Sequence, residues 1–499
     1  MTFNSFEFIA FYPLVVFLFF ILPHRFRWIL LLTASSVFYM VFSWQYLIVI
    51  YVIIAINYCL GIGIIKKNGH TREALFRVGI ILNILILVFF KYFNYLNIDL
   101  RKFSRFLKLN YPDHFIQIIL PLGLSFFTFS AISYLVDVKK KAARAERHPG
   151  ILASYFLFFP KMMQGPIERT GNVLPQFYKK HEFTYENATE GMKMMAWGFF
   201  KKLVIADWLA FFVNAVFASP AEQAGLILLL ASVFFAIQIY ADFSGYMDIA
   251  LGSAKILGFK LTPNFRRPYF ADSIKEFWNR WHIGLSSWLR DYLFLPIAYS
   301  LSRKIKKESY LNIRADKWIY IVTAFVTFIV CGVWHGVGWT YLFWGGIFGF
   351  YLSFALLTKK FRKIANKKLG LTRNPRIYKA VKVLTTFILI DFAWIFFRAN
   401  SLSDAFTIMR RLFYDWSFPL TKSSLSAINQ YGLSRRQLLA VVFFTAVMFF
   451  ADILSEKKDI LQRINEQPLL VRWGIYYFIT YIILFFGTAG SKPFIYFRF

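Results

Sequence analysis

Two histidines stand apart from the other ionisable residues of this sequence. Five of the seven histidines lie in polar segments, where an imidazole needs no special explanation: His24, His70, His114, His148 and His181. His282 and His335 lie instead in apolar, aromatic surroundings. Ionisable groups at membrane depth are costly and usually face a cavity or a partner. An imidazole near its ordinary pKa could take the proton of an alcohol that attacks an acyl group, so both are candidate catalytic residues. The alternative is a structural histidine between helices.

The surroundings of His335 predict an irregular segment inside the membrane. Three glycines and two tryptophans lie within four residues of it: Gly332, Gly336, Gly338, Trp334 and Trp339. Glycine permits close backbone approach or an unusual turn. Irregular backbone within a bilayer must line protein or a water-filled cavity. The pattern therefore places His335 where a reaction cavity could form.

His282 lies on a different kind of element. Ser273 and Glu276 fit a capping box, which predicts the start of a helix, and apolar residues follow at helical spacing through position 289. His282 falls on this apolar stripe beside Trp278 and Trp281. The pattern indicates one short amphipathic helix that lies in the interface or dips into it. The alternative is an interfacial tryptophan belt with an incidental imidazole.

The composition indicates which elements position these residues. Of 499 residues 58% are hydrophobic, 21% aromatic and only 17% charged, which excludes a soluble enzyme and a disordered chain. Apolar runs near the ~20 residues needed for a bilayer predict an all-α polytopic membrane protein of about 11–13 transmembrane helices. The runs lie near 3–22, 28–44, 46–65, 76–97, 115–137, 190–218, 223–241, 318–334, 339–357, 380–397, 437–453 and 473–488. Shorter runs near 151–160, 243–258 and 291–301 predict re-entrant or interfacial helices. The first run reads as a retained helix.

The charge distribution orients part of the chain. Lysine and arginine total 58 against 26 acidic residues, a net charge of +32, and the basic residues lie mainly between apolar runs. This distribution favours cytoplasmic loops near anionic lipid over binding to nucleic acid. The strongly basic segments 303–317 and 359–382 should be cytoplasmic. The chain between them then crosses and returns, with His335 deep in the membrane or near its far side. The basic segment 98–114 does not fit simple alternation and stays unassigned.

No metal site is predicted. Cys59 and Cys331 both lie in apolar stretches, which argues against a disulfide framework or a thiolate site. Asp242 and Asp248 are six residues apart, about 240° around a helix, so they do not face one shared ion. Hydrogen bonds within the protein are their expected role.

Two pairs of cations are candidates for contact with phosphate. We expect Lys201 and Lys202 to extend toward lipid phosphates, with contact to coenzyme A as the sharper alternative. Arg266 and Arg267 precede the His282 segment and could hold a phosphate or serve as an interfacial anchor.

Four passages together resemble the membrane-bound O-acyltransferase family, and most closely its branch that O-acetylates bacterial polysaccharides such as alginate. They are Phe-Pro-Lys-Met-Met-Gln-Gly-Pro-Ile at 159–167, Tyr-Ala-Asp-Phe-Ser-Gly-Tyr-Met-Asp-Ile-Ala at 240–250, Phe-Trp-Asn-Arg-Trp-His-Ile-Gly-Leu-Ser at 277–286 with Leu-Arg-Asp-Tyr-Leu at 289–293, and Cys-Gly-Val-Trp-His-Gly at 331–336. The blocks span about 180 residues in the order that the family shows.

The resemblance implies tilted helices around a central tunnel, in one domain covering 1–499. N-terminal helices occupy 1–137, a catalytic core with both histidines 150–357, and C-terminal helices with an aromatic tail 358–499. Acetyl-CoA, or another acyl-CoA, would enter from the cytoplasm as the donor, with no bound cofactor. His335 would act as general base or position the acyl group, and His282 would assist from the cytoplasmic mouth. Residues that would line the tunnel or substrate are Trp334, Gly336, Trp281, Asp242 and Asp248.

The resemblance also implies partners and a location. In similar systems the membrane protein passes its acyl group to an exported hydrolase-like partner of the SGNH type, which modifies the polysaccharide acceptor. The expected location is the bacterial inner membrane, with lipid all around. The chain ends in Phe-Ile-Tyr-Phe-Arg-Phe at 494–499, which resembles the end of this branch and the tail of a small partner in teichoic acid D-alanylation. Tyr496 is thereby a candidate acyl carrier. A phenol with a pKa near 10 needs a nearby base to act as a nucleophile, and an interfacial aromatic belt is the simpler alternative.

Other functions remain open at this stage. D-alanyl or other acyl transfer would use the same fold. A transporter or lipid flippase would also have many helices, but such proteins commonly show duplicated halves and no duplication is visible here. A membrane glycosyltransferase would need a soluble nucleotide-sugar domain, and no loop is long enough for one.

Overall fold

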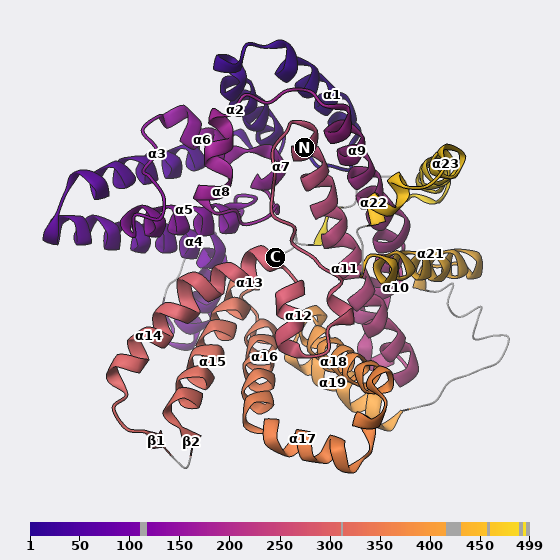
Figure 1. Cartoon of the computed structure of the whole chain (residues 1–499). Coiled ribbons are helices and arrows are strands. Elements are labelled where there is room, and N and C mark those ends of the chain that lie inside the picture. The colour runs from indigo at the N-terminus through magenta and orange to yellow at the C-terminus, as the bar shows by residue number, and fades with distance from the viewer. Residues whose placement is uncertain (110–116, 311–312, 416–430, 457–459, 489–492, 496–499) are drawn as a thin grey trace. The chain divides into compact units, whose positions relative to one another are not determined.

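The computed structural model describes the chain except for residues 110–116, 311–312, 416–430, 457–459, 489–492 and 496–499. The described part is almost entirely helical (Figure 1). Its strands are β1 (Ser309–Tyr310) and β2 (Ile313–Arg314), which pair antiparallel with Ser309 opposite Arg314. The predicted all-α class is confirmed.

The chain divides into two compact units. Unit 1 comprises Met1–Met195 and Ile249–Thr262, and unit 2 comprises Ala196–Asp248 and Pro263–Phe499. Helices α9 (Tyr185–Phe199) and α11 (Gly225–Ile256) contribute residues to both units. The other elements of unit 1 are α1 (Phe6–Ile21), α2 (His24–Met40), α3 (Trp44–Lys66), α4 (Gly69–Phe106), α5 (Leu124–Lys139), α6 (Pro149–Leu157), α7 (Phe159–Met162), α8 (Thr170–Val173) and the 3₁₀ turn η1 (Leu174–Tyr178).

Unit 2 holds both candidate histidines. Besides β1 and β2, its elements are the π-helix η2 (Phe200–Ala206), α10 (Asp207–Ala218), η3 (Pro220–Glu222), η4 (Pro268–Phe270), α12 (Ile274–Arg280), α13 (Ile283–Leu289), the π-helix η5 (Arg290–Phe294), α14 (Leu295–Lys304), α15 (Ala315–His335), α16 (Trp339–Leu357), α17 (Lys359–Lys368), η6 (Leu371–Arg373), α18 (Pro375–Arg398), α19 (Leu402–Tyr414), α21 (Arg435–Leu454), α22 (Ile460–Asn465) and α23 (Leu469–Phe486).

Eight helices among the described residues are long and apolar enough to cross a membrane. They are α3, α4, α11, α15, α16, α18, α21 and α23. The most apolar window of α4 is only 11% buried and that of α23 only 6%. Apolar helices this exposed would be an aggregation hazard in water, so their surroundings are lipid. The chain is a multi-pass membrane protein.

Several spans predicted from the sequence have different bounds in the structure. The predicted runs at 28–44 and 115–137 correspond to α2, of 17 residues, and α5, of 16 residues, which are shorter than the eight helices above. The run at 190–218 is a chain of α9, η2 and α10. The separate re-entrant piece expected at 243–258 is wrong, because α11 continues unbroken through Ile256. Residues 98–106, left unassigned above, extend α4.

The two strongly basic segments lie at the same end of one helix pair. Helix α15 begins directly after the β1–β2 hairpin, and α16 ends directly before α17. The two helices lie side by side and run in opposite directions (Figure 1). His335 is therefore at the opposite end of α15, about 30 Å from the basic hairpin at a rise of ~1.5 Å per residue.

Candidate active site

His335 is the last residue of α15 and is enclosed by aromatic rings. Its side chain is 3% exposed. The imidazole centroid lies 4.6 Å from that of Trp334, 5.0 Å from Trp344 of α16 and 5.2 Å from Phe397 of α18. Trp344 and Phe397 meet it edge to face, an arrangement that aromatic quadrupoles favour. Three helices thereby fix the position of one imidazole.

Glycine allows α15 and α16 to approach this closely. A Cβ atom at Gly345 would lie 2.9 Å from the carbonyl carbon of Phe328, and one at Gly349 would lie 2.9 Å from the ring of Phe325. A Cβ at Gly336 would overlap the ring of Tyr341. Gly336 has extended backbone, with φ −168°. Of the three glycines singled out in the sequence, Gly332 and Gly336 show close packing, because an added Cβ would overlap the backbone or the ring of Tyr341.

The segment that carries His282 is broken at the histidine. Ser273 caps α12 as predicted, its hydroxyl accepting the amide of Glu276. The single amphipathic helix predicted across 274–289 is wrong, because α12 ends at Arg280 and α13 begins at Ile283. His282 has φ +44°, a left-handed conformation that is uncommon for residues other than glycine.

Asn264 stabilises this break, and the sequence analysis did not identify it. Its backbone carbonyl accepts the amide of Ile283 at 2.9 Å, and its side-chain oxygen accepts the amide of Gly284 at 2.7 Å. Both are among the first amides of α13, which have no acceptor within the helix. The dipeptide Pro263-Asn264 is a turn signal, but a capping role 20 residues away leaves no local pattern.

The structure brings the two histidines to one tryptophan. His282 is fully buried and meets Phe243 of α11 edge to face, with centroids 4.8 Å apart. The indole of Trp334 lies 6.5 Å from the ring of His282 and 4.6 Å from that of His335. Trp281 is also buried, and its ring centroid lies 5.2 Å from that of Trp394 of α18. Trp334, Gly336 and Trp281 therefore belong to the same cluster as the histidines.

The lysines at 201 and 202 do not extend toward lipid, so that expectation is wrong. Lys202 is 1% exposed, and its Nζ lies 2.6 Å from Asp242 Oδ1 and 2.9 Å from Asp207 Oδ1. Lys201 pairs with Asp248 at 2.5 Å. Carboxylates of α10 and α11 pair with both ammonium groups and lower the free-energy cost of burying them. The two lysines can therefore lie inside the protein instead of at the lipid–water interface. As expected, Asp242 and Asp248 bond within the protein.

The arginines at 266 and 267 lie beside the start of α12. Arg266 is exposed, and its amide donates to the carbonyl of Arg280 at 2.9 Å. Arg267 has φ +50°, and its carbonyl accepts Arg280 Nη1 at 3.4 Å. These contacts hold the turn that leads into the His282 segment. A role in phosphate binding stays a prediction.

One membrane carboxylate was missed. Asp391 of α18 is 7% exposed and accepts a hydrogen bond from Ser232 of α11, with the oxygens 2.8 Å apart. It is the one acidic residue in the apolar run 380–397. Intramembrane carboxylates are functional candidates by default, so this signal was present in the sequence. Tyr496, the candidate acyl carrier, lies outside the described residues.

Comparisons with known proteins agree with this architecture. The profile of the membrane-bound O-acyltransferase family matches residues 90–397, a stretch that includes both histidines. The chain is 32% identical over 469 residues to a probable alginate O-acetylase of Pseudomonas aeruginosa, covering 92% of this chain and 84% of the relative. It is 32% identical to a peptidoglycan O-acetyltransferase of Helicobacter pylori, with 76% and 72% covered. A teichoic acid D-alanyltransferase of Bacillus subtilis is 28% identical, with 58% and 70% covered.

Proposed function

Because this chain belongs to the membrane-bound O-acyltransferase family, we propose that it moves an acetyl group from cytosolic acetyl-CoA toward hydroxyl groups of an extracytoplasmic polysaccharide. The names of its relatives support an O-acetyl transfer, since several act on alginate or peptidoglycan. The proposed location is the bacterial inner membrane. The two basic segments near the start of α15 and the end of α16 would attract the phosphates of the donor and of the inner leaflet.

In the proposed mechanism His335 is the general base. An acceptor hydroxyl oxygen attacks the thioester carbonyl while His335 takes the hydroxyl proton. The carbon–sulfur bond then breaks, the acetyl group stays on the oxygen, and the proton passes to the sulfur so that coenzyme A leaves as a thiol. The single observation that carries this assignment is the buried imidazole at the end of α15, held by Trp344 and Phe397 of two other helices. Such fixed geometry supports positioning of reactants.

His282 is proposed to assist from the side of the donor. Its left-handed backbone and the Asn264 cap fix the ring against Phe243. Strained, well-supported conformations of this kind cluster at functional sites. Trp334 lies near both imidazoles and would form a wall of the proposed tunnel.

The acetyl group is proposed to leave through a relay. Tyr496 would accept it on the phenol oxygen, and an exported SGNH-hydrolase-like partner would carry it to the polymer. Tyr496→Phe removes only that oxygen. Loss of both acetyl-CoA consumption and polymer acetylation in the folded protein would support the relay, whereas unchanged acetylation would eliminate Tyr496 as a carrier.

Membranes containing His335→Ala test the main assignment. Loss of a general base lowers rates by about 10²–10⁴-fold, so consumption of labelled acetyl-CoA should fall to background. Val333→Ala is a matched control, because this neighbour is 39% exposed and lies outside the aromatic cluster. Full activity in a folded His335→Ala protein would refute the assignment.

A second candidate function is D-alanyl transfer, favoured by the similarity to teichoic acid D-alanyltransferases. An assay with labelled acetyl-CoA distinguishes acetyl transfer from D-alanyl transfer. If the thioester is not consumed by membranes that do transfer D-alanine from a carrier, the acetyl assignment fails and the D-alanyl assignment stands.

A further inference from the structure

One buried charged cluster of unit 2, formed by Lys202, Asp207 and Asp242, gains hydrogen-bond partners from the end of the chain. The ammonium of Lys202 has three N–H donors. Two point to Asp242 Oδ1 and Asp207 Oδ1, and Nζ lies 3.3 Å from a third acceptor, the carbonyl oxygen of Pro493. A buried donor without an acceptor is costly. The carbonyl of Pro493 in the tail therefore supplies the third hydrogen-bond acceptor, in addition to the two carboxylates.

The acidic side of the cluster also gains a partner from the tail. One ammonium is shared by two carboxyl groups within the group of Lys202, Asp207 and Asp242. Asp242 Oδ2 accepts the backbone amide of Ile495 at 2.7 Å, a charge-assisted bond of the strong kind. The tail amide thus stabilises the carboxylate that shares its ammonium with a second acid.

Aromatic contacts complete the attachment. Phe494 is fully buried, with the ammonium of Lys202 4.3 Å from its ring centroid. Its ring also meets Tyr246 of α11 edge to face at 4.9 Å. A cation over a desolvated ring is worth more than at an exposed site. Residues 493–495 are therefore held by hydrogen bonds, charge and packing together.

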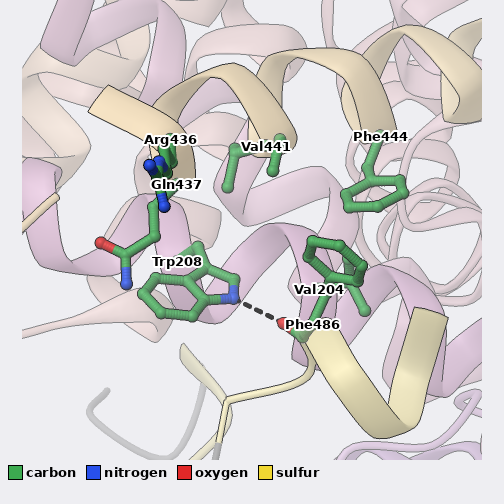
Figure 2. Close-up of a pocket in the computed structure, with 8 residues that line it drawn as sticks. Val204, Trp208, Arg436, Gln437, Val441, Phe444 and Phe486 are labelled. Carbon is green, nitrogen blue, oxygen red and sulfur yellow. Dashed lines mark hydrogen bonds between the residues drawn. The ribbon is translucent and has the colours of Figure 1, made fainter. Parts of the chain in front are cut away.

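The chain that leads to the tail is fixed to η2 and to the first residues of α10. Figure 2 shows Trp208 donating its indole N–H to the carbonyl of Phe486, the last residue of α23, at 2.7 Å. Thr488 donates its amide to Leu203 of η2 at 3.1 Å, and its hydroxyl contacts Asp207 Oδ2 at 3.2 Å. The segment is anchored on both sides of residues 489–492. Of the anchoring residues, Leu203 lies in the π-helix η2, and π-helical turns occur frequently at functional sites.

A cavity lies beside the end of this segment. Its volume is about 240 Å³, and its lining combines the charged cluster and the tail with polar and apolar side chains of α10 and α11: Lys202, Asp207, Ala210, Phe211, Asn214, Gln238, Asp242, Pro493 and Ile495. The carbonyl oxygen of the Gln238 side chain is buried, and no hydrogen-bond donor to it occurs in the described part of the chain. Ile495, which lines the cavity, directly precedes residue 496 in the sequence.

We infer that Lys202 and Asp242 are positioning residues for the proposed acyl relay, because they dock residues 493–495 at the wall of this cavity. The docking stands on the contacts of residues 493–495 alone. Its consequence for catalysis rests on the proposed carrier role of Tyr496.

A cysteine reporter measures docking directly. Ile495→Cys keeps the backbone amide, and position 495 is only 8% exposed. Cys59→Ser removes the exposed native thiol, whereas the buried Cys331 stays as an internal report of folding. Labelling of the thiol introduced at position 495 by a hydrophilic maleimide is followed by intact mass on the purified full chain in detergent.

Two charge-matched variants separate docking from general destabilisation. Asp242→Ala and Asp207→Ala each remove one carboxylate and leave a one-to-one pair with Lys202, but only Asp242→Ala removes the acceptor of the Ile495 amide. Hydrogen bonds to charged groups are strong enough that labelling should rise roughly 10–100-fold in Asp242→Ala. It should change by less than about threefold in Asp207→Ala, which loses the ion pair with Lys202 but, of the contacts with the end of the chain, only the long one with Thr488.

Labelling of Cys331 would reveal that Asp242→Ala fails to fold. In that case a second variant, at a position outside the helices, tests the docking. Phe494→Ala removes the ring under the ammonium and leaves the charged cluster intact, so it should also raise labelling at position 495. Equal labelling in the two aspartate variants, or no rise with Phe494→Ala, would overturn the docking. If labelling rises while polymer acetylation is unchanged, docking stands and the carrier role of Tyr496 fails.

Discussion

Replacing Gly345 by alanine should displace His335 without touching it. Gly345 lies in α16 where the helix meets the backbone of α15, and an added Cβ would lie 2.9 Å from the carbonyl carbon of Phe328 and 3.4 Å from Cα of Ile329. Carbon atoms in contact prefer about 3.5–4.0 Å, and the carbonyl oxygen of Phe328 would lie closer still, so the helices must separate by at least roughly 0.6–1.1 Å. The backbone of Phe328 cannot turn away as a flexible side chain could.

Separating α15 from α16 should move His335 in two ways, through its own helix and through its neighbour Trp344. His335 lies on α15 two turns beyond Phe328, and Trp344, the neighbour of Gly345, contacts its ring at 5.0 Å. A shift of about 1 Å in a catalytic group can lower the rate ~10²-fold. Overpacking also costs about 1–3 kcal/mol of stability. We expect a roughly 10–100-fold slower consumption of labelled acetyl-CoA, together with a lower Tm of the detergent-purified protein.

The neighbouring glycine provides the control. A Cβ at Gly346 would lie 3.9 Å from Cδ1 of Ile329, an ordinary contact, and alanine favours a helix by up to about 1 kcal/mol over glycine. Gly346→Ala should therefore keep both activity and Tm. If Gly345→Ala behaves like Gly346→Ala in both measurements, the close helix pair does not position His335.

Two further predictions concern stability in unit 1. Asn57 and Asn83 exchange reciprocal amide hydrogen bonds of 3.1 and 2.9 Å between α3 and α4; Asn57→Leu should cost about 1–3 kcal/mol by leaving a buried amide unpaired, and adding Asn83→Leu should restore much of the Tm, with no recovery contradicting the pairing. Burial lowers the pKa of Lys161 to about 7 despite the opposing charge of Glu168, so the unfolded chain binds more protons between pH 7 and 10.5 and stability should rise with pH there. Lys161→Met should flatten this rise in Tm, and an unchanged slope would assign it to another group.

Local patterns in the sequence were sufficient for the class of protein, and they singled out two histidines that the structure buries. Long apolar runs, basic segments 303–317 and 359–382 and the glycines around His335 act through near neighbours along the chain. A bilayer imposes the same length and charge rules on every span. These rules do not predict where a helix breaks, and therefore the single helix expected across His282 was wrong.

The tertiary structure decided which polar groups could be buried. The capping of α13 depends on Asn264, 20 residues before Gly284, and the burial of Lys202 depends on Asp242 and on a tail amide more than 250 residues from it. The cost of burying a charge is set by the partners that folding brings to it. A window of sequence contains the charge but not those partners, so it predicted lysines at a lipid surface where the folded chain has an internal cluster.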